Sequence, residues 1–461
     1  QLIRQCTTPN YINTWLAMAR LVFALFGGLT VFSGAIQSPL QMGDTKSLSV
    51  GEAPHFWPCK NGNLLRNGVS LYSAPTDLTT PLWEWTVPGH TTRVGHIEST
   101  PLIDRNSNVY IETTDGGIYA LAKNGTQLWK RSEDGRIITG ALDGDSLYTG
   151  TSAGVALSID LATGEENWRK KYNLMAGGDA WSVTVAGGMA ILVGAPGDLT
   201  GAGGNNEIVA LSTADGSEKW RYPVGTVIYN FMPVVLDNKL IFIDFTGAMY
   251  CLTLTDGTLQ WKTGGAPGGF TTAGVTVGPT GLAYTNFNTN GASGGMLKAY
   301  DVQTGEERWS RNLGLEASAA PVVGQLGPDA PVGVVVGIGH NVGFWHPDLQ
   351  DAQAQLRAFD AMTGADLWTF TTPHQMLRGS AGLYSVQGED SVPDTWSTTA
   401  IGSDGTIYAG WEGGKQFAVE GATGKMISSH FTGYGDQGEP AIGDDFVVIP
   451  SIGKVVAFGT A

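Results

Sequence analysis

The chain has 461 residues, of which 15% are charged, with 66 glycines and 14 tryptophans, so it is neither a coiled coil nor a disordered acidic chain. The formal net charge of −16 argues against a nucleic-acid partner, because a phosphate backbone requires a basic surface. Cys6, Cys59 and Cys251 lie far apart without a CxxC motif, so they allow at most one disulfide and indicate no metal site.

The first predicted element is an apolar segment near the N-terminus. Residues 21–36 carry no charge, and Arg4 and Arg20 precede them. This pattern fits either a cleaved secretory signal or a short helical anchor within residues 12–36, and we prefer the anchor. In both cases the preceding positive charges place the rest of the chain on the non-cytosolic side of a membrane, in an organelle lumen, the periplasm or the extracellular space.

From residue 115 onwards, the chain repeats a pattern of strand, tight turn and strand. Clear copies are DGGIYALAKNGTQLWKR (115–131) and GGMLKAYDVQTGEERWSRN (294–312). A tryptophan follows each turn glycine by four residues, except in the seventh copy, which has Ser428. The large flat ring of such a tryptophan suits the seam between stacked sheets. The tryptophans are Trp129, Trp168, Trp220, Trp261, Trp309 and Trp368.

A second column of residues supports the same alignment. On the strand before each turn glycine, the aligned position always holds a small residue, as a crowded position between sheets requires. These residues are Ala120, Ser158, Ala210, Cys251, Ala299, Ala358, Ala418 and Ala457.

Another pair of apolar strands lies upstream of each copy, so each repeat has four strands, and isolated units of this kind close into a ring. The eighth copy ends before its outer strand, and PLWEWTVPG (81–89) has no partner of its own. We therefore predict an all-β, eight-bladed propeller over residues 81–461, closed by pairing 81–89 with the strand near 454–459. Trp85 would then supply the eighth seam tryptophan. Residues 1–37 form the N-terminal segment and 38–80 a lead-in linker.

The repeats AYDVQTGEERW (299–309) and AFDAMTGADLW (358–368) resemble those of the pyrroloquinoline-quinone (PQQ)-like propeller family. The lead-in WPCKNGNLLRNGVS (57–70) resembles the segment that enters the propeller in this family. The resemblance implies one of two functional classes. One class comprises dehydrogenases that oxidise alcohols or sugars with PQQ and calcium, and the other comprises non-catalytic propellers, including outer-membrane assembly lipoproteins. Cys6 follows no lipidation motif, which disfavours the lipoproteins.

If the chain were a dehydrogenase, the loops before the innermost strands would supply its site. The catalytic candidates are then Glu98, Asp179 and Asp394, and the cofactor-binding candidates are Trp181, Asn230 and Trp396. Tyr229, Glu316, Asp436 and Glu439 precede other innermost strands and should also face the central funnel. Trp181 and Trp396 could alternatively stack on sugar rings.

No adjacent cysteine pair or complete dehydrogenase signature is present, so the preferred hypothesis is a propeller without PQQ, calcium or another metal. His340 and His346 share one loop but lack a third ligand. Long loops carry the aromatic residues Phe344, Trp345 and Tyr384, which are typical anchors of protein interfaces. We therefore expect a non-catalytic scaffold or accessory subunit of a membrane complex, with other protein subunits as partners; whether the chain is an enzyme stays open.

Overall fold

A computed structural model describes residues 54–91, 94–178, 181–197, 204–265, 268–289, 294–340, 351–376, 396–433 and 435–460. These residues belong to one compact unit, which spans residues 40–461. The expected N-terminal helix and anchor within residues 12–36 lie outside the described ranges. Within those ranges, no helix has the length and apolar character needed to cross a membrane.

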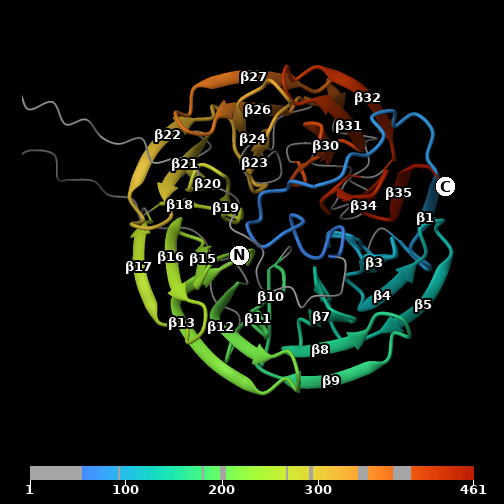
Figure 1. Cartoon of the computed structure of the whole chain (residues 1–461), viewed down its shortest axis with the longest axis vertical. Coiled ribbons are helices and arrows are strands. Elements are labelled where there is room, and N and C mark those ends of the chain that lie inside the picture. Colours follow the sequence, from blue (N-terminus) through green and yellow to red (C-terminus); the bar gives the residue numbers. More distant parts are fainter. Residues whose placement is uncertain are drawn as a thin grey trace, which may run out of the picture. The chain divides into compact units, whose positions relative to one another are not determined.

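Eight antiparallel sheets, each built around four strands, follow one another in a ring, which confirms the predicted eight-bladed propeller (Figure 1). In blades one to four the strands run from the innermost to the outermost in chain order. These strands are β2 (Leu102–Ile103), β3 (Val109–Glu112), β4 (Gly117–Leu121), β5 (Gln127–Ser132); β6 (Ala141–Asp143), β7 (Ser146–Gly150), β8 (Val155–Asp160), β9 (Glu166–Lys171); β10 (Thr184–Ala186), β11 (Met189–Gly194), β12 (Asn205–Ser212), β13 (Glu218–Ile228); and β14 (Val234–Leu236), β15 (Lys239–Ile243), β16 (Ala248–Thr253), β17 (Leu259–Gly264).

Blade five has an additional short strand, and two strands beside blade six pair with each other, β25 (Asp351–Ala352) with β28 (Gln375–Met376). The strands of blades five to eight are β18 (Gly269–Phe270), β19 (Thr276–Val277), β20 (Leu282–Thr289), β21 (Gly295–Asp301), β22 (Glu307–Asn312); β23 (Val322–Gln325), β24 (Val332–Ile338), β26 (Gln355–Asp360), β27 (Asp366–Thr371); β29 (Ala400–Ile401), β30 (Thr406–Trp411), β31 (Lys415–Glu420), β32 (Met426–Phe431); and β33 (Ala441–Gly443), β34 (Phe446–Ser451), β35 (Lys454–Gly459), β1 (Trp83–Thr86).

The two ends of the propeller sequence close the ring in blade eight. Strand β1 pairs antiparallel with β35 as its outermost strand, which confirms the predicted closure. In this register Trp83 lies opposite Ala457, and Trp85 lies opposite Val455. Because Ala457 belongs to the column of small residues, the eighth seam tryptophan is Trp83. The prediction of Trp85 was wrong by two residues, and Trp85 instead makes an edge contact with Tyr119.

Each seam tryptophan packs on the turn glycine of the next blade. A Cβ atom at Gly164, for example, would lie 2.8 Å from the Trp129 ring, and the φ of Gly164 is +73°. Only glycine satisfies both the backbone conformation and the close approach. The seven pairs are Trp83 on Gly125, Trp129 on Gly164, Trp168 on Gly216, Trp220 on Gly257, Trp261 on Gly305, Trp309 on Gly364 and Trp368 on Gly424.

The seam between blades seven and eight uses hydrogen bonds in place of a tryptophan. Blade eight has no turn between its two outer strands, because they come from opposite ends of the propeller sequence. The chain entering β1 lies there: the Ser428 hydroxyl accepts from the Leu78 N–H at 2.9 Å and donates to the Thr76 carbonyl at 2.5 Å. Leu78 of the entering chain is fully buried in the apolar cluster that joins blades seven, eight and one.

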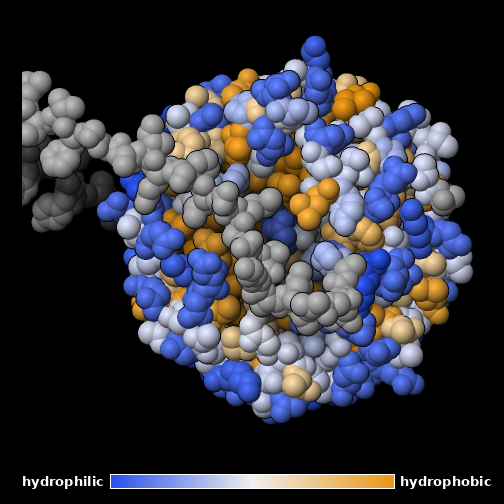
Figure 2. Space-filling model, viewed as in Figure 1, coloured by the Kyte–Doolittle hydropathy of each residue, from blue (hydrophilic) through white to orange (hydrophobic). Residues whose placement is uncertain are grey.

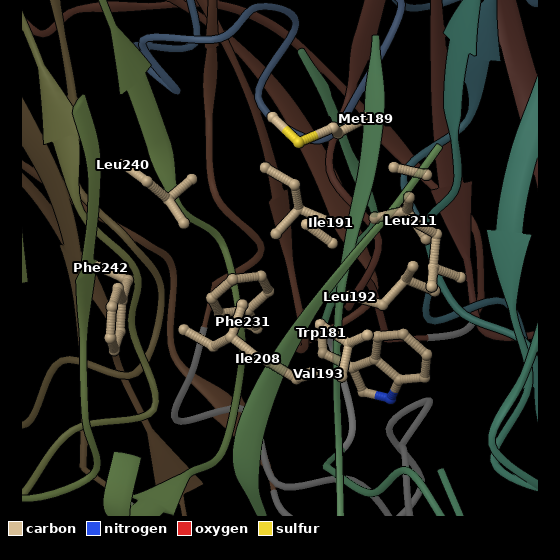
Figure 3. Packing of buried hydrophobic residues seen from close by; sticks show 14 of the residues in the cluster. Trp181, Met189, Ile191, Leu192, Val193, Ile208, Leu211, Phe231, Leu240 and Phe242 are labelled. Carbon is tan, nitrogen blue, oxygen red and sulfur yellow. The ribbon is translucent and has the colours of Figure 1, made fainter. Parts of the chain in front are cut away.

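Buried side chains of neighbouring blades form the core. The largest cluster joins blades two, three and four, and Figure 3 shows Trp181 and Phe231 among its aliphatic side chains. Cys251 is buried in a similar cluster, opposite Trp261, and burial raises the pKa of its thiol to about 11. Both observations agree with the role expected for a small residue in the seam.

Candidate functional site

The segment before β1 crosses the centre of the ring (Figure 1). We call residues 56–78 the lead-in segment. Trp57 exchanges two backbone hydrogen bonds of 3.0 Å with Ile103 of blade one. The Pro58 carbonyl accepts from the Leu142 N–H of blade two at 2.7 Å. The segment therefore begins by pairing with the innermost strands of the first two blades.

Four further blades donate to carbonyls of the lead-in segment. The bonds are Val235 N–H to Leu64 O at 2.8 Å, Val277 N–H to Leu65 O at 2.9 Å, Val323 N–H to Asn67 O at 3.0 Å and Ile401 N–H to Gly68 O at 2.7 Å. These donors belong to the innermost strands of blades four to seven, and no other described strand pairs with them on that side. The lead-in segment thus supplies acceptors that an inner strand would otherwise lack.

Arg66 joins the lead-in segment to blades three and four. Its side chain is fully buried, and its guanidinium donates to Thr184 Oγ1 at 2.5 Å, to the Pro233 carbonyl at 3.0 Å and to the Lys60 carbonyl at 2.6 Å. An unpaired buried cation is costly, and these acceptors compensate part of that cost. Arg66 therefore holds the lead-in segment against the inner ends of blades three and four, which form part of the wall of the central channel of the ring.

Glu439, in the loop before β33, connects the segment to blade eight. Its carboxylate lies 3.2 Å from Lys60 Nζ and accepts from the Asn61 N–H at 3.2 Å and the Thr100 hydroxyl at 2.6 Å. All these groups are buried. With this contact, the lead-in segment reaches every blade of the propeller.

Two more carboxylates of the channel wall bond across the first blades. Glu98 forms an ion pair with Arg136. Glu112 accepts from the Gly140 N–H at 2.5 Å and from the Thr149 hydroxyl of blade two. Burial raises the pKa of Glu112 to about 8, so it holds a proton at neutral pH.

Asp436 lies between blades seven and eight and is fully buried. Burial, reinforced by the nearby Glu412 carboxylate, raises the pKa of Asp436 well above its ordinary value. The Gln416 side chain and the Trp411 backbone N–H oppose this shift. Neither lies in good hydrogen-bonding geometry with the carboxyl oxygens.

The structure places both tryptophans proposed for ligand stacking inside the blade seams. A Cβ atom at Gly150 would lie 3.0 Å from the Trp181 ring, and one at Gly337 would lie 2.6 Å from the Trp396 ring. Both side chains are buried. They pack on the glycines of the preceding blades, as the outer seam tryptophans pack on the following ones, and present no free ring face for a sugar or a quinone.

The remaining predicted funnel residues do not converge on one point. Asn230 donates to the Thr272 carbonyl at 3.0 Å, which connects two successive crossover loops, and Tyr229 packs near Phe245. Glu316 lies 3.6 Å from His340 Nδ1. Asp179, Asp394, Phe344, Trp345 and Tyr384 lie outside the described residues, as does His346.

The four described residues among these catalytic and cofactor-binding candidates do not form a site that fits PQQ and calcium. Glu98 is paired with Arg136, Asn230 is bonded to a neighbouring loop, and the two tryptophans are packed in seams. Among the described residues, no three His, Cys, Asp or Glu side chains are grouped to hold a metal ion. We therefore derive no reaction step through these groups.

Sequence reasoning missed the residues that organise the channel, namely Lys60, Arg66 and Glu112. Arg66 stood in the lead-in motif, but its burial depends on contacts with residues more than one hundred positions away. Glu112 did leave a signal, because a charged residue ends the otherwise apolar strand VYIE. Such a carboxylate indicates a buried contact between elements.

Comparison with known families finds a match over residues 80–170, 170–342 and 292–458 to the family described as outer membrane protein assembly factor BamB. A curated protein with the same description, from Burkholderia pseudomallei (strain K96243), is 27% identical over 241 residues. That alignment covers 49% of this chain and 58% of the relative, so the chain matches little more than half of the relative's length.

Solved structures share the architecture at low sequence identity. BamB from Moraxella catarrhalis has a TM-score of 0.58 and 16% identity, covering 83% of this chain and 99% of that one. The quinohemoprotein alcohol dehydrogenase ADHIIG from Pseudomonas putida HK5 has a TM-score of 0.64 and 12% identity, covering 88% and 81%. At these identities, both structures show the fold alone.

Proposed function

The chain belongs to the family described as outer membrane protein assembly factor BamB, and from this premise we propose that it is a non-catalytic accessory subunit of a membrane-associated complex. The name of the curated relative supports other protein subunits of an outer membrane assembly as the partners. The missing lipidation motif at Cys6 argued against the outer-membrane assembly class. The family match overrides that argument, because it rests on residues 80–458 and does not include Cys6.

The observation that carries this proposal is that the carboxylates along the central channel bond to neighbouring blades and to the lead-in segment. In the dehydrogenase hypothesis, the polar groups of the channel would face a cofactor. In this chain, Glu98, Glu112 and Glu439 hold neighbouring blades together or hold the lead-in segment. These carboxylates therefore support a structural role for the inside of the ring, and we propose that the loops and the rim bind partners.

We propose further that the propeller works without PQQ or calcium and that it lies on the non-cytosolic side of the membrane, anchored within residues 12–36. The positive residues Arg4 and Arg20 before the apolar run support this orientation. On the face shown in Figure 2, hydrophilic residues are distributed around the whole rim with apolar ones between them, a surface compatible with protein partners.

Purification from native membranes in mild detergent tests the proposal. We expect the tagged chain to comigrate with other proteins in a native gel and to need detergent for extraction. The double variant Phe344→Ala and Trp345→Ala should weaken the copurification, whereas Leu174→Ala, at an exposed position elsewhere, should not. A chain that runs alone and is extracted without detergent would contradict the proposal.

A further inference from the structure

The outer strand of blade seven differs from the other outer strands. Strand β32 has the sequence MISSHF and carries no Asp, Glu, Lys or Arg, whereas each of the seven other outer strands carries at least one. Charged residues on an edge strand prevent pairing with other chains. The edge of blade seven therefore lacks the protection that the other blades have.

The apolar side chains of β32 face solvent. Met426 is 51% exposed, Ile427 46% and Phe431 55%. Burial lowers the pKa of His430, so the strand is uncharged at neutral pH. Strand β32 lies at the outer rim of the ring, and among the described strands it pairs with β31 alone (Figure 1).

The backbone geometry shows which groups remain open. Thr432 donates its N–H to the Gly414 carbonyl of the β31 side at 3.0 Å. Backbone groups alternate between the two sides of a strand, so Ser428 and His430 also face β31, and Ser429 and Phe431 face outward. Within the described part of the chain, no backbone group bonds to the outward side of Ser429 or Phe431.

We propose that β32 pairs antiparallel with β32 of a second copy of this chain, so that blades seven of two propellers form one continuous sheet. A twofold axis perpendicular to the sheet places the residue at the centre of the contact opposite the same residue of the second copy. With Ser429 at that centre, two hydrogen bonds join the Ser429 backbones, and Phe431 of one copy lies beside Ile427 of the other. Aromatic and β-branched residues form favourable cross-strand pairs.

The occupant follows from the charges of the strand itself. In the same register, five other outer strands would place a charged residue against its own copy, which is destabilising. These residues are Lys130, Arg169, Arg221, Lys262 and Glu84. Strand β32 places a serine there and flanks it with large apolar residues, so it is self-complementary without an opposite charge on the partner. The contact is small, and we expect a weak, concentration-dependent dimer.

Sedimentation of the full chain in mild detergent at increasing protein concentration tests the dimer. The mass should double at high concentration. Ile427→Lys should keep the chain monomeric, while Leu128→Lys, at the equivalent and 51% exposed position of blade one, should leave the dimer intact. A monomer at every concentration would overturn the proposal, and so would a dimer that tolerates Ile427→Lys or is lost with Leu128→Lys.

Cross-linking tests the register in a Cys6→Ser background, in which the remaining cysteines, Cys59 and Cys251, are buried. Opposite Cα atoms of a hydrogen-bonded antiparallel pair lie about 5.5 Å apart, within the reach of a disulfide. Ser429→Cys should therefore form a covalent dimer on mild oxidation, and Lys130→Cys, at the same position of blade one, should not. Equal cross-linking of both variants, or of neither, would overturn this pairing.

Discussion

The seam between blades one and two and the seam between blades seven and eight perform the same task with different chemistry. In the first, Trp129 packs on Gly164 of the next blade. In the second, Ser428 forms hydrogen bonds with Thr76 and Leu78. The difference follows from the course of the chain. Where the next blade has a turn between its two outer strands, a tryptophan packs on that turn. Where the chain enters blade eight, a small residue leaves room for the entering segment.

The inner ends of the same two seams are similar to each other. Each contains a buried carboxyl group whose pKa is raised by burial, Glu112 in the first and Asp436 in the second. In these two seams, blade closure therefore changes the outer contacts, while the inner end of each keeps a buried carboxyl group. The following predictions test the two halves of this comparison, from the largest expected effect to the smallest.

Removal of residues 454–461 should abolish cooperative folding. The deletion removes β35, leaves β1 without a partner and exposes the edge of β34. Val455, Val456 and Phe458 are fully buried, and the burial of each contributes about 2 kcal/mol, a sum comparable to the whole stability of many domains. Thermal unfolding followed by circular dichroism measures the effect. Removal of Thr460 and Ala461 alone should leave the transition in place, and an unchanged transition after the longer deletion would refute the closure argument.

Glu112→Gln should remove part of the pH dependence of stability. The folded state raises the pKa of Glu112 from 4.5 to about 8, so the folded chain holds a proton that the unfolded chain releases. The stabilising contribution is therefore complete below about pH 4.5 and declines until about pH 8. Each pKa unit corresponds to about 1.4 kcal/mol, so the decline should amount to a few kcal/mol.

Urea unfolding at several pH values measures this decline. The glutamine can accept from Gly140 and donate to Thr149, so the variant should fold. It should gain stability relative to the original chain as the pH rises from 5 to 8. Parallel curves for the two proteins would show that Glu112 does not titrate as described.

Gly164→Ala should destabilise the chain more than Gly144→Ala. Both glycines have positive φ angles, +73° and +57°, so alanine is strained by about 1–2 kcal/mol at each position. Only at Gly164 does the new methyl group meet the Trp129 ring, which adds about 1–3 kcal/mol. Urea unfolding should show this difference. Equal effects would mean that the tryptophan does not pack closely on the turn.

Ser428→Ala should cost about 1 kcal/mol, because the Thr76 carbonyl and the Leu78 N–H lose their partner in a half-buried seam. Ser429→Ala, on the neighbouring position, should change stability little. Ser428→Trp should be worse than alanine, since the entering chain occupies the space of the ring. A stabilising tryptophan would show that this seam resembles the other seven after all.

Local sequence patterns were sufficient to predict the ring. The turn glycines, the tryptophans and the small residues recur at fixed spacing, and the closure followed from an unpaired strand at each end. The pairing register was harder to predict from the sequence. The two tryptophans of WEWT lie two positions apart, on the same face of the strand, and only the pairing with Ala457 distinguishes Trp83 from Trp85.

The channel could not be predicted in the same way. A position before an innermost strand predicts a side chain that faces the funnel, but Trp181 and Trp396 at such positions turn into the seams. The lead-in segment was expected to be a linker, yet its described residues bond to every blade. These contacts join residues that lie from 46 positions apart (Trp57 and Ile103) to 379 positions apart (Lys60 and Glu439), and no local periodicity records them.

The most direct test of the central claim, that the channel holds the ring together and holds no cofactor, is the melting temperature with and without PQQ and calcium. A ligand at one hundred times its dissociation constant would stabilise the folded chain by about 2.7 kcal/mol, which a melting curve resolves easily. We predict no change in melting temperature. A clear increase that disappears in Glu98→Ala would contradict the claim and support a quinoprotein dehydrogenase.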